Sequence, residues 1–422
     1  MSNDRAPLRH TAYRRLFAAQ VVALLGTGLL TVALSLLAYE VAPGSAGVVV
    51  GTALSIKMIA YVAMAPALTA LTAGMPPRVV LVGSDVVRVL VAATLPWVDQ
   101  VWQVYVLIFI LQAASATFNP TYQALLPTVL PRMADYTRAL SYSRLAYDLE
   151  AVASPLVAAA ALLVVSYHGL FAGTAVGFFL SAVLVLRSRQ GLTSDAAATA
   201  SFRQRMTAGV RMFAARRQLR ALLALDLAAA GGTAMVLVNT VVVTRQTLGR
   251  EGDSVAVVLG VFGAGSMVAA LALPRVLAHR TERQVMLSGA IGTTVAMVGA
   301  AFVTSGSSSW PGLLVVWFLL GAAGSVALTP GGQVINRCVS EAERPPAFAA
   351  HFSLSHACYL LAYPVAGWVG SQAGLPVAAA VLAVISAAAT IVAAITWSDQ
   401  QVADASPDRS ASEPSRHDDC EP

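Results

Sequence analysis

Long apolar segments, separated by short polar interruptions, recur along almost the whole sequence. A helix that crosses a membrane needs about twenty apolar residues, and each of these segments is close to that length. The pattern therefore predicts an all-α membrane protein with twelve transmembrane helices. We expect spans at 16–38, 47–71, 79–97, 103–126, 139–165, 170–186, 219–243, 255–273, 285–304, 311–336, 347–370 and 377–397.

Charged residues make up only 11% of the 422 residues, too few to cover a soluble protein of this size, because soluble domains carry roughly 25%. We therefore do not expect a soluble enzyme or a nucleic-acid-binding domain. The single lysine, Lys57, lies in Leu54-Ser55-Ile56-Lys57-Met58, so no phosphate-binding GxxxxGK[ST] loop exists and ATP hydrolysis by that route is excluded. We expect no enzyme activity and no cofactor, since no nucleophile–base or metal constellation has workable spacing.

Arginine placement predicts the orientation, because positively charged loops stay in the cytoplasm. With the N-terminus inside, almost all arginines outside the spans fall on the cytoplasmic side, and only Arg245 and Arg250 fall outside. We therefore expect a multi-pass protein of the cell inner membrane with both termini in the cytoplasm. The expected regions are an N-terminus (1–15), a six-helix bundle (16–186), an Arg-rich linker (187–218), a second six-helix bundle (219–397) and a disordered tail (398–422).

The linker has a pattern of its own. Phe202, Met206, Val210 and Phe213 recur at helical spacing among arginines. This favours an amphipathic helix that lies on the inner leaflet and is attracted to anionic lipid. The alternative is a solvated charged linker.

The two halves of the sequence resemble each other. Asn119-Pro120-Thr121-Tyr122-Gln123 matches Thr329-Pro330-Gly331-Gly332-Gln333, and Pro155 matches Pro364, each pair about 210 residues apart. Gly51 and Met58 match Gly260 and Met267 at nearly the same offset. The repeat predicts two pseudo-symmetric bundles with a site at mid-depth between them, as in many transporters.

Five runs carry a family resemblance: RRLFAAQ from Arg14, SDVVR from Ser84, VWQVYVL from Val101, NPTYQALLP from Asn119 and RALSYSRL from Arg138. From Leu8 to Trp397 the chain resembles a transporter of the major facilitator superfamily. The runs at Ser84, Asn119 and Arg138 are most similar to its drug:proton antiporter-3 branch, and those at Arg14 and Val101 are similar to nickel-resistance exporters. The resemblance implies alternating access and a central cavity lined by the first, fourth, seventh and tenth spans.

The loop between the second and third spans departs from the family pattern, which carries a glycine, an aspartate and basic residues that hold the cytoplasmic side closed. Only Arg78 remains of the charges. Asp85 and Arg88 are three residues apart on one helix face, so they are expected to pair. Together these three residues form the candidate cytoplasmic gate; the alternative for Asp85 and Arg88 is a pair that only anchors a helix end.

Ionisable residues inside a bilayer are costly and are therefore candidate functional residues. Lys57 and Glu150 each lie about ten residues into their spans, about 15 Å deep. A contact of Lys57 with Glu150 or Asp148 would neutralise both charges, either for proton coupling or as a static buried pair. Asp226, in the seventh span, is expected to meet a proton or a cationic substrate, or to be wetted by the cytoplasm.

Uncharged polar residues in the spans could line the substrate cavity or bridge helices. In the eleventh span, His351 and Cys358 lie about 10 Å apart along the axis, too far to hold one metal ion, whereas His356, Tyr359 and Tyr363 share a face. The candidate cavity residues are Gln112, Asn119, Gln123, Asn239, Gln333, His356 and Tyr359.

The expected function is secondary active transport, with export of small molecules or drugs driven by proton antiport. The direction is implied by the resemblance alone. One alternative is a divalent-cation exporter for nickel or cobalt, and an alternative of another class is a non-transporting membrane sensor or scaffold. The expected partners are a small-molecule or cation substrate, protons and membrane lipid, with no nucleic acid and no ATP, and we expect a monomer.

Overall fold

The computed structural model describes residues 7–42, 46–188, 201–244, 248–249, 252–305 and 309–397. Within these residues the chain is helical, without strands. The linker segment 189–200 lies outside the described residues, as does the tail 398–422, which the sequence predicts to be disordered.

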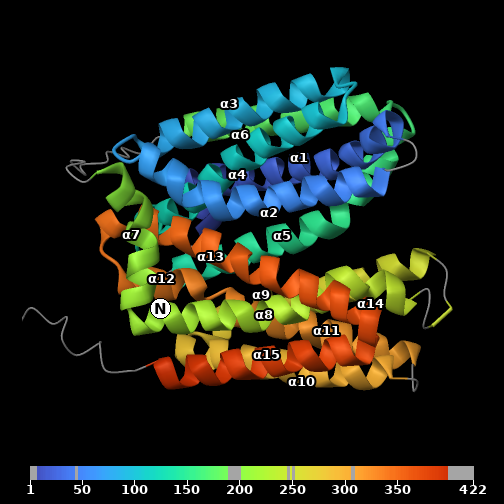
Figure 1. The fold of residues 1–422 in the computed structure, drawn as a ribbon. Helices are drawn as coiled ribbons and strands as arrows, with labels where there is room; N and C mark the ends of the chain where they lie inside the picture. The colour runs from blue at the N-terminus through green and yellow to red at the C-terminus, as the bar shows by residue number, and fades with distance from the viewer. Residues whose placement is uncertain are drawn as a thin grey trace, which may run out of the picture.

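The helices form two bundles that lie side by side (Figure 1). The first bundle contains η1 (Pro7–Arg9), α1 (Thr11–Val41), α2 (Ala46–Leu71), α3 (Pro77–Thr94), η2 (Leu95–Trp97), α4 (Val101–Val129), α5 (Met133–Leu162) and α6 (Tyr167–Arg187). After the linker helix α7 (Phe202–Ala215), the second contains α8 (Arg217–Val242), α9 (Gly252–Val276), α10 (Glu282–Thr304), α11 (Trp310–Leu328), α12 (Gly331–Cys338), η4 (Glu341–Glu343), α13 (Arg344–Pro364), η5 (Val365–Val369), α14 (Gly370–Ala373) and α15 (Leu375–Thr396).

These helices correspond to the twelve expected spans. In the described residues, ten spans are long and apolar enough to cross a membrane, and α5, which bends by 42°, brings the number to eleven. The helix α13, continued by η5 and α14, is not among these apolar spans. It packs against α2, α4 and α8 and corresponds to the one remaining expected span. The twelve-helix architecture in two bundles is therefore confirmed.

Two spans are less regular than the sequence predicts. The expected span 311–336 is broken between α11 and α12 at Thr329–Pro330, because proline lacks an amide hydrogen and fits poorly inside a helix. The expected span 347–370 passes through the π-helical turn η5 directly after Pro364. Between α2 and α3, Gly74 has φ of 88°, a conformation that favours glycine, so the chain turns sharply there.

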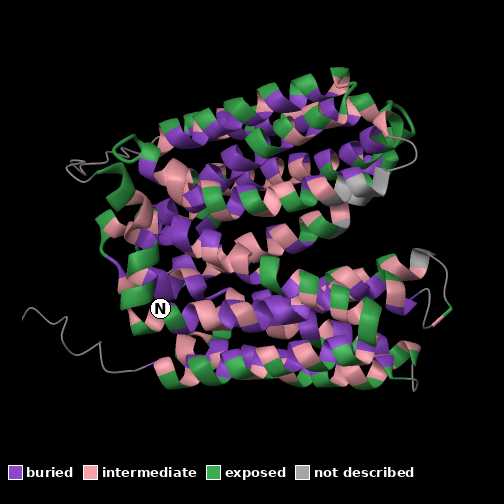
Figure 2. Ribbon diagram, in the orientation of Figure 1, coloured by how far each residue is buried: buried purple, intermediate pink, exposed green. Residues whose placement is uncertain are grey.

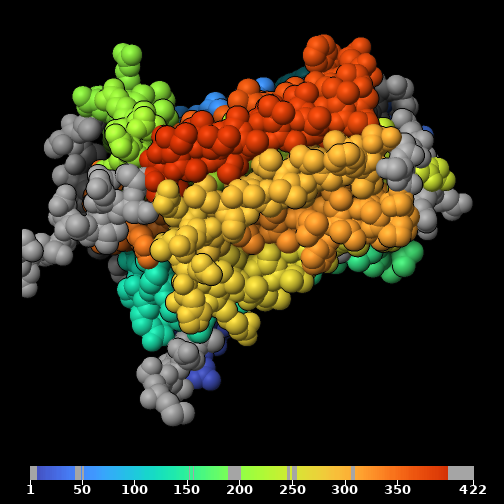
Figure 3. Space-filling view, turned by 90° about the horizontal axis from the view of Figure 1, so that it is seen from below, coloured from blue at the N-terminus to red at the C-terminus, as the bar shows by residue number. Residues whose placement is uncertain are grey.

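Buried residues face the inside of each bundle and exposed residues lie on its outer faces (Figure 2). Many of the exposed residues are large and apolar, as expected for contact with lipid. One outer face of the second bundle is formed by α15, α10, α11 and α9 (Figure 3). Both ends of the described chain lie at the end of the molecule that also holds α7 (Figure 1). We call this the linker end.

The linker helix α7 packs against α13, α2 and α8. A side chain at Gly209 would overlap the carbonyl oxygen of Pro346, so α7 and α13 touch through their backbones. Of the apolar face seen in the sequence, Phe213 is buried against the second bundle, whereas Phe202 and Val210 are exposed. Its contact with the inner leaflet stays a prediction.

Candidate functional site

Lys57 lies in the middle of α2, and α2 contacts the helix α13 of the second bundle. Among the residues that the structure describes, no ion pair includes Lys57; its ammonium nitrogen lies 5.6 Å from the centre of the Tyr61 ring. The one described carboxylate whose charge acts on Lys57 is that of Glu150. Lys57 is half-buried, so its charge is available to a ligand or to Glu150.

Glu150 faces α1 from the middle of α5. Its Oε1 accepts a hydrogen bond of 3.3 Å from Ser154, one turn further along α5. A side chain at Gly28 of α1 would overlap both Ser154 and the Glu150 carboxylate, so only glycine leaves room for them. The charge of Glu150 also acts on Tyr61 and Tyr147. Glu150 and Lys57 therefore share one electrostatic neighbourhood without forming an ion pair.

Asp148 points away from Glu150, towards α9 of the second bundle. It forms an ion pair of 3.4 Å with Arg144 on its own helix and accepts a hydrogen bond of 2.5 Å from Ser266. Arg144 Nε in turn donates to Ser266 Oγ at 3.0 Å. The contact of Lys57 with Asp148 that the sequence allowed is therefore replaced by a pair within α5 and a contact with α9.

Asp226 is buried in α8 and has a partner that the sequence did not indicate. His351 Nε2 of α13 lies 3.0 Å from Asp226 Oδ2. The His351 ring stacks with Phe213 of the linker helix, with centroids 6.1 Å apart. His351 is therefore the side chain that contacts the Asp226 carboxylate, and it connects Asp226 to α7.

Aromatic side chains meet where α2 and α13 cross. The Tyr61 ring lies 4.9 Å from Phe352 and 4.8 Å from His356, and His356 lies 6.1 Å from Tyr359. His356 Nδ1 lies 2.6 Å from the carbonyl oxygen of Phe352. Because a carbonyl oxygen only accepts, Nδ1 carries the hydrogen, and Nε2 of the neutral ring is left as an acceptor.

The uncharged polar candidates differ in their partners, and their role in lining a cavity stays a prediction. Gln112 is buried with its Oε1 unpaired among the described residues, Asn119 accepts from Tyr147 at 3.5 Å, and Gln123 is half-buried. Asn239 bridges helices instead, because its amide donates to the carbonyl oxygen of Ala366 in η5 at 3.2 Å. Gln333 also bridges, since its amide donates to the hydroxyl of Thr137 in the other bundle.

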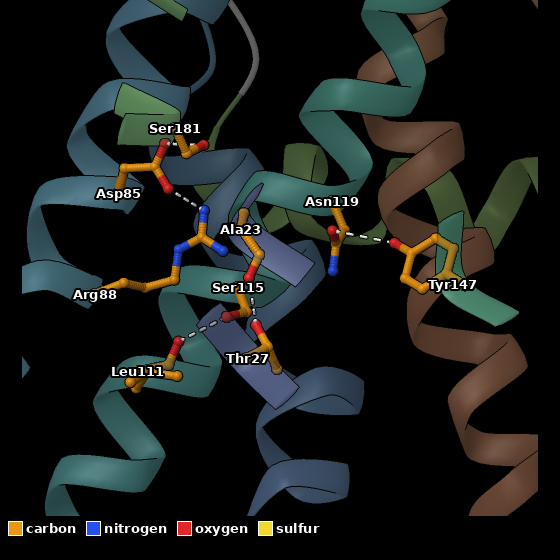
Figure 4. Close-up of polar contacts among 9 residues, drawn as sticks. All are labelled: Ala23, Thr27, Asp85, Arg88, Leu111, Ser115, Asn119, Tyr147 and Ser181. Carbon is orange, nitrogen blue, oxygen red and sulfur yellow. Dashed lines mark hydrogen bonds and ion pairs between the residues drawn. The ribbon is translucent and has the colours of Figure 1, made fainter. Parts of the chain in front are cut away.

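The three gate candidates all tie α3 to its own bundle. Asp85 and Arg88 form a buried ion pair, and Ser181 of α6 donates to Asp85 at 2.8 Å (Figure 4). The Arg88 guanidinium lies over the rings of Phe118 and Phe178, 4.3 and 4.5 Å from their centres. Arg78 donates to the backbone carbonyl of Leu186. A gating role for this set stays a prediction.

The bundles contact each other where α2 meets α13 and where α5 meets α9. Towards the linker end, Thr128 donates to Glu341 at 3.3 Å, and Arg344 lies 3.5 Å from both. Nearer to mid-depth, Ser353 donates to the carbonyl oxygen of Val62. These contacts bring the bundles together on the linker side of Lys57 and Glu150.

Four residues of this region escaped the sequence analysis as candidates: Tyr61, Tyr147, Ser266 and His351 as a partner of Asp226. Tyr61 is one helical turn from Lys57, which is the one signal that could have identified it. Ser266 carries no charge and lies in an apolar span, so nothing in the sequence distinguishes it. In the described residues, no group of three His, Cys, Asp or Glu side chains is arranged to hold a metal ion.

A family model described as Major Facilitator Superfamily matches residues 16–281 and 227–417. No curated protein sequence shows significant similarity to the chain. Among solved structures, the chain is similar to the human organic anion transporter MFSD10 (TETRAN), with a TM-score of 0.75 at 13% identity, over 92% of this chain and 100% of that one.

Two bacterial structures have the same fold. The fucose:proton symporter FucP of E. coli has a TM-score of 0.72 at 13% identity, over 93% of this chain and 100% of that one. A bacterial homologue of the iron transporter ferroportin, in its outward-facing state, has a TM-score of 0.71 at 13% identity, over 91% of this chain and 98% of that one.

Proposed function

Because the chain belongs to the Major Facilitator Superfamily, we propose that this membrane transporter is a proton-coupled exporter of small molecules. The two bundles rock around the mid-depth site, so that the site opens alternately to each side of the membrane. Similarity of the runs at Ser84, Asn119 and Arg138 to the drug:proton antiporter-3 branch supports export by antiport and drug-like substrates. The arginine distribution supports an inner-membrane location with the linker end in the cytoplasm.

The observation that carries the proposal is the placement of Lys57 and Glu150. Lys57 lies in the middle of α2 and Glu150 in the middle of α5, both are half-buried, and neither takes part in an ion pair among the described residues. Asp85, Asp148 and Asp226 each already have a basic partner. Glu150 is therefore the carboxylate that binds a proton as hydration of the cavity changes, and Lys57 supplies the competing positive charge.

The test is dye efflux from proteoliposomes with an imposed proton gradient. We expect Glu150→Gln and Lys57→Ala each to reduce proton-driven efflux by at least tenfold. Glu40→Gln is the matched control, because Glu40 lies at the end of α1 and bonds to Tyr167 far from the site. Efflux that is unchanged in both site variants would show that this pair does not couple protons to transport.

A divalent-cation exporter is the second candidate. A carboxylate without an ion pair at mid-depth favours it, as does the fold shared with the ferroportin homologue. A strain that lacks the protein should then be sensitive to Ni²⁺ or Co²⁺ and not to dyes or drugs. A protein that moves neither class of substrate in proteoliposomes would favour the sensor or scaffold role.

A further inference from the structure

Ser266 of α9 is completely buried, and its hydroxyl group lies against an ion pair of the other bundle. It accepts a hydrogen bond from Arg144 and donates one to Asp148, while Arg144 and Asp148 also pair with each other. A hydroxyl group has one donor hydrogen and lone pairs that accept, so Ser266 uses both functions on one ion pair. Hydrogen bonds to charged groups are about twice as strong as those between neutral groups.

The three residues differ in what happens to them when the bundles separate. Arg144 and Asp148 are four residues apart on α5, so their ion pair moves with the first bundle as a unit. Ser266 belongs to the second bundle. Opening of the linker end therefore leaves the ion pair intact and breaks both hydrogen bonds of Ser266.

The position of Ser266 is fixed by its own bundle. Side chains at Gly265 of α9 and Gly321 of α11 would overlap the carbonyl oxygens of Phe318 and Phe262, respectively, so the two helices touch through their backbones. Such close contacts leave little freedom for α9 to follow α5. Ser266 therefore moves with α11 and the rest of the second bundle.

We propose that Ser266 is a positioning residue of the transport cycle, whose hydroxyl group fastens α9 to the Arg144–Asp148 pair and holds the linker end closed. This inference rests on the proposed transport function but concerns the balance between open and closed states. Loss of the hydroxyl group shifts that balance towards the state that is open at the linker end. Removal of the charge on Asp148 has the same effect, because it weakens the same contact.

The experiment measures distances between spin labels on the full chain in lipid nanodiscs, without substrate or proton gradient. Labels at Ala134→Cys, at the start of α5, and Ala278→Cys, beyond the end of α9, report the separation of the bundles at the linker end, and both positions are exposed. The native cysteines are replaced by alanine. We expect Ser266→Ala to raise the ratio of long to short distances roughly tenfold, as loss of a hydrogen bond to a charged group implies.

Asp148→Asn should raise the same ratio, and the double variant should raise it no further than the larger single effect, since both changes remove one shared contact. Additive shifts would mean that the two residues act separately, which contradicts the proposal.

Ser386→Ala is the matched control. Ser386 is also a buried serine of the second bundle, but its hydrogen bonds to Thr294 (3.1 Å) and to the carbonyl oxygen of Ala228 (3.2 Å) stay within that bundle. The Ser386→Ala variant should lower the midpoint of thermal unfolding without changing the distances between the spin labels. Unchanged distances in Ser266→Ala, or an equal shift in Ser386→Ala, would overturn the proposal. A protein that shows the shift but transports nothing would refute only the transport function.

Discussion

The Asp85–Arg88 pair illustrates how charged residues are accommodated inside an apolar helix bundle. The Asp85 carboxylate accepts hydrogen bonds from Arg88 and Ser181, and the Arg88 guanidinium lies over the rings of Phe118 and Phe178. A buried pair of this kind contributes little net stability, but loss of one partner is costly, because the remaining charge stays buried without compensation.

We therefore expect Asp85→Asn to destabilise the protein by about 3–5 kcal/mol, the range measured for breaking buried ion pairs. The measurement is a thermal or denaturant midpoint in detergent. Asp85→Leu combined with Arg88→Met removes both charges and should recover much of the loss. A double variant as unstable as Asp85→Asn would show that the rings and Ser181, and not the charges, hold this region together.

Glu343, between α12 and α13, titrates outside the spans. Partial burial raises the pKa of its carboxyl, but hydrogen bonds from the Ser340 backbone and from Arg216, together with the Arg216 charge, outweigh this and hold the pKa below its ordinary value of 4.5. A carboxyl whose pKa is lower in the folded protein stabilises the fold above the unfolded pKa. That contribution is lost as the pH falls through the folded pKa.

The thermal midpoint should therefore fall more steeply below about pH 4.5 in the wild type than in Glu343→Gln. Thermal scans of both proteins from pH 3 to 7 measure this difference. Parallel curves for the two proteins would show that the Arg216–Glu343 contact contributes nothing to stability.

At the scale of elements, the second bundle depends on glycines that let helices touch. Gly265 and Gly321 face each other's helices, and each would overlap a carbonyl oxygen if it carried a side chain. Close approach of helices through small residues is a common way to pack transmembrane helices, which gain no hydrophobic energy from leaving lipid.

We expect Gly321→Ala to lower stability by about 1–3 kcal/mol, the usual cost of overpacking. Gly260→Ala is the matched control on α9, because a methyl group there would meet nothing within 4 Å. It should be neutral or slightly stabilising, since alanine favours helices. Thermal midpoints in the same detergent compare the two, and equal midpoints would contradict the close contact of α9 with α11.

The spans and the two bundles were predictable because they depend on apolar periodicity and on a repeat within the sequence. The pairing of Asp85 with Arg88 was also predictable, because the two are one turn apart on one helix. The partners of Asp148 and Asp226 were not. Ser266 and His351 lie more than 100 residues from them in sequence, and neither serine nor histidine in a span indicates which helix it will face.

At the scale of the whole molecule, the bundles meet on the linker side of the candidate site. Thr128 of α4 and Glu341 of η4 form one of these contacts, with 3.3 Å between their side-chain oxygens. If the bundles rock, this pair must separate in each cycle.

A short bifunctional thiol reagent that joins Thr128→Cys to Glu341→Cys should therefore reduce the transport rate at least tenfold. The cross-linked protein should stay folded. Transport should return after reduction of the cross-link. Glu282→Cys with Arg337→Cys, a contact of 3.0 Å within the second bundle at the same end, controls for the effect of a cross-link itself. Continued transport by the cross-linked Thr128–Glu341 variant would exclude rocking at this contact.

The π-helical turn at Val365–Val369 matters for how the last segment of the eleventh span, α14, is oriented. A π turn holds one residue more than an α turn, and each residue of an α-helix turns the chain by about 100°. An extra residue inserted into a regular α-helix would therefore swing the residues after it, here Gly370–Ala373, around the axis by that angle. The wide turn takes up its extra residue locally, so deletion of one residue from the turn would restore regular winding and leave the orientation of the tip nearly unchanged. The change would fall inside the turn, where the amide of Asn239 bonds to the carbonyl oxygen of Ala366.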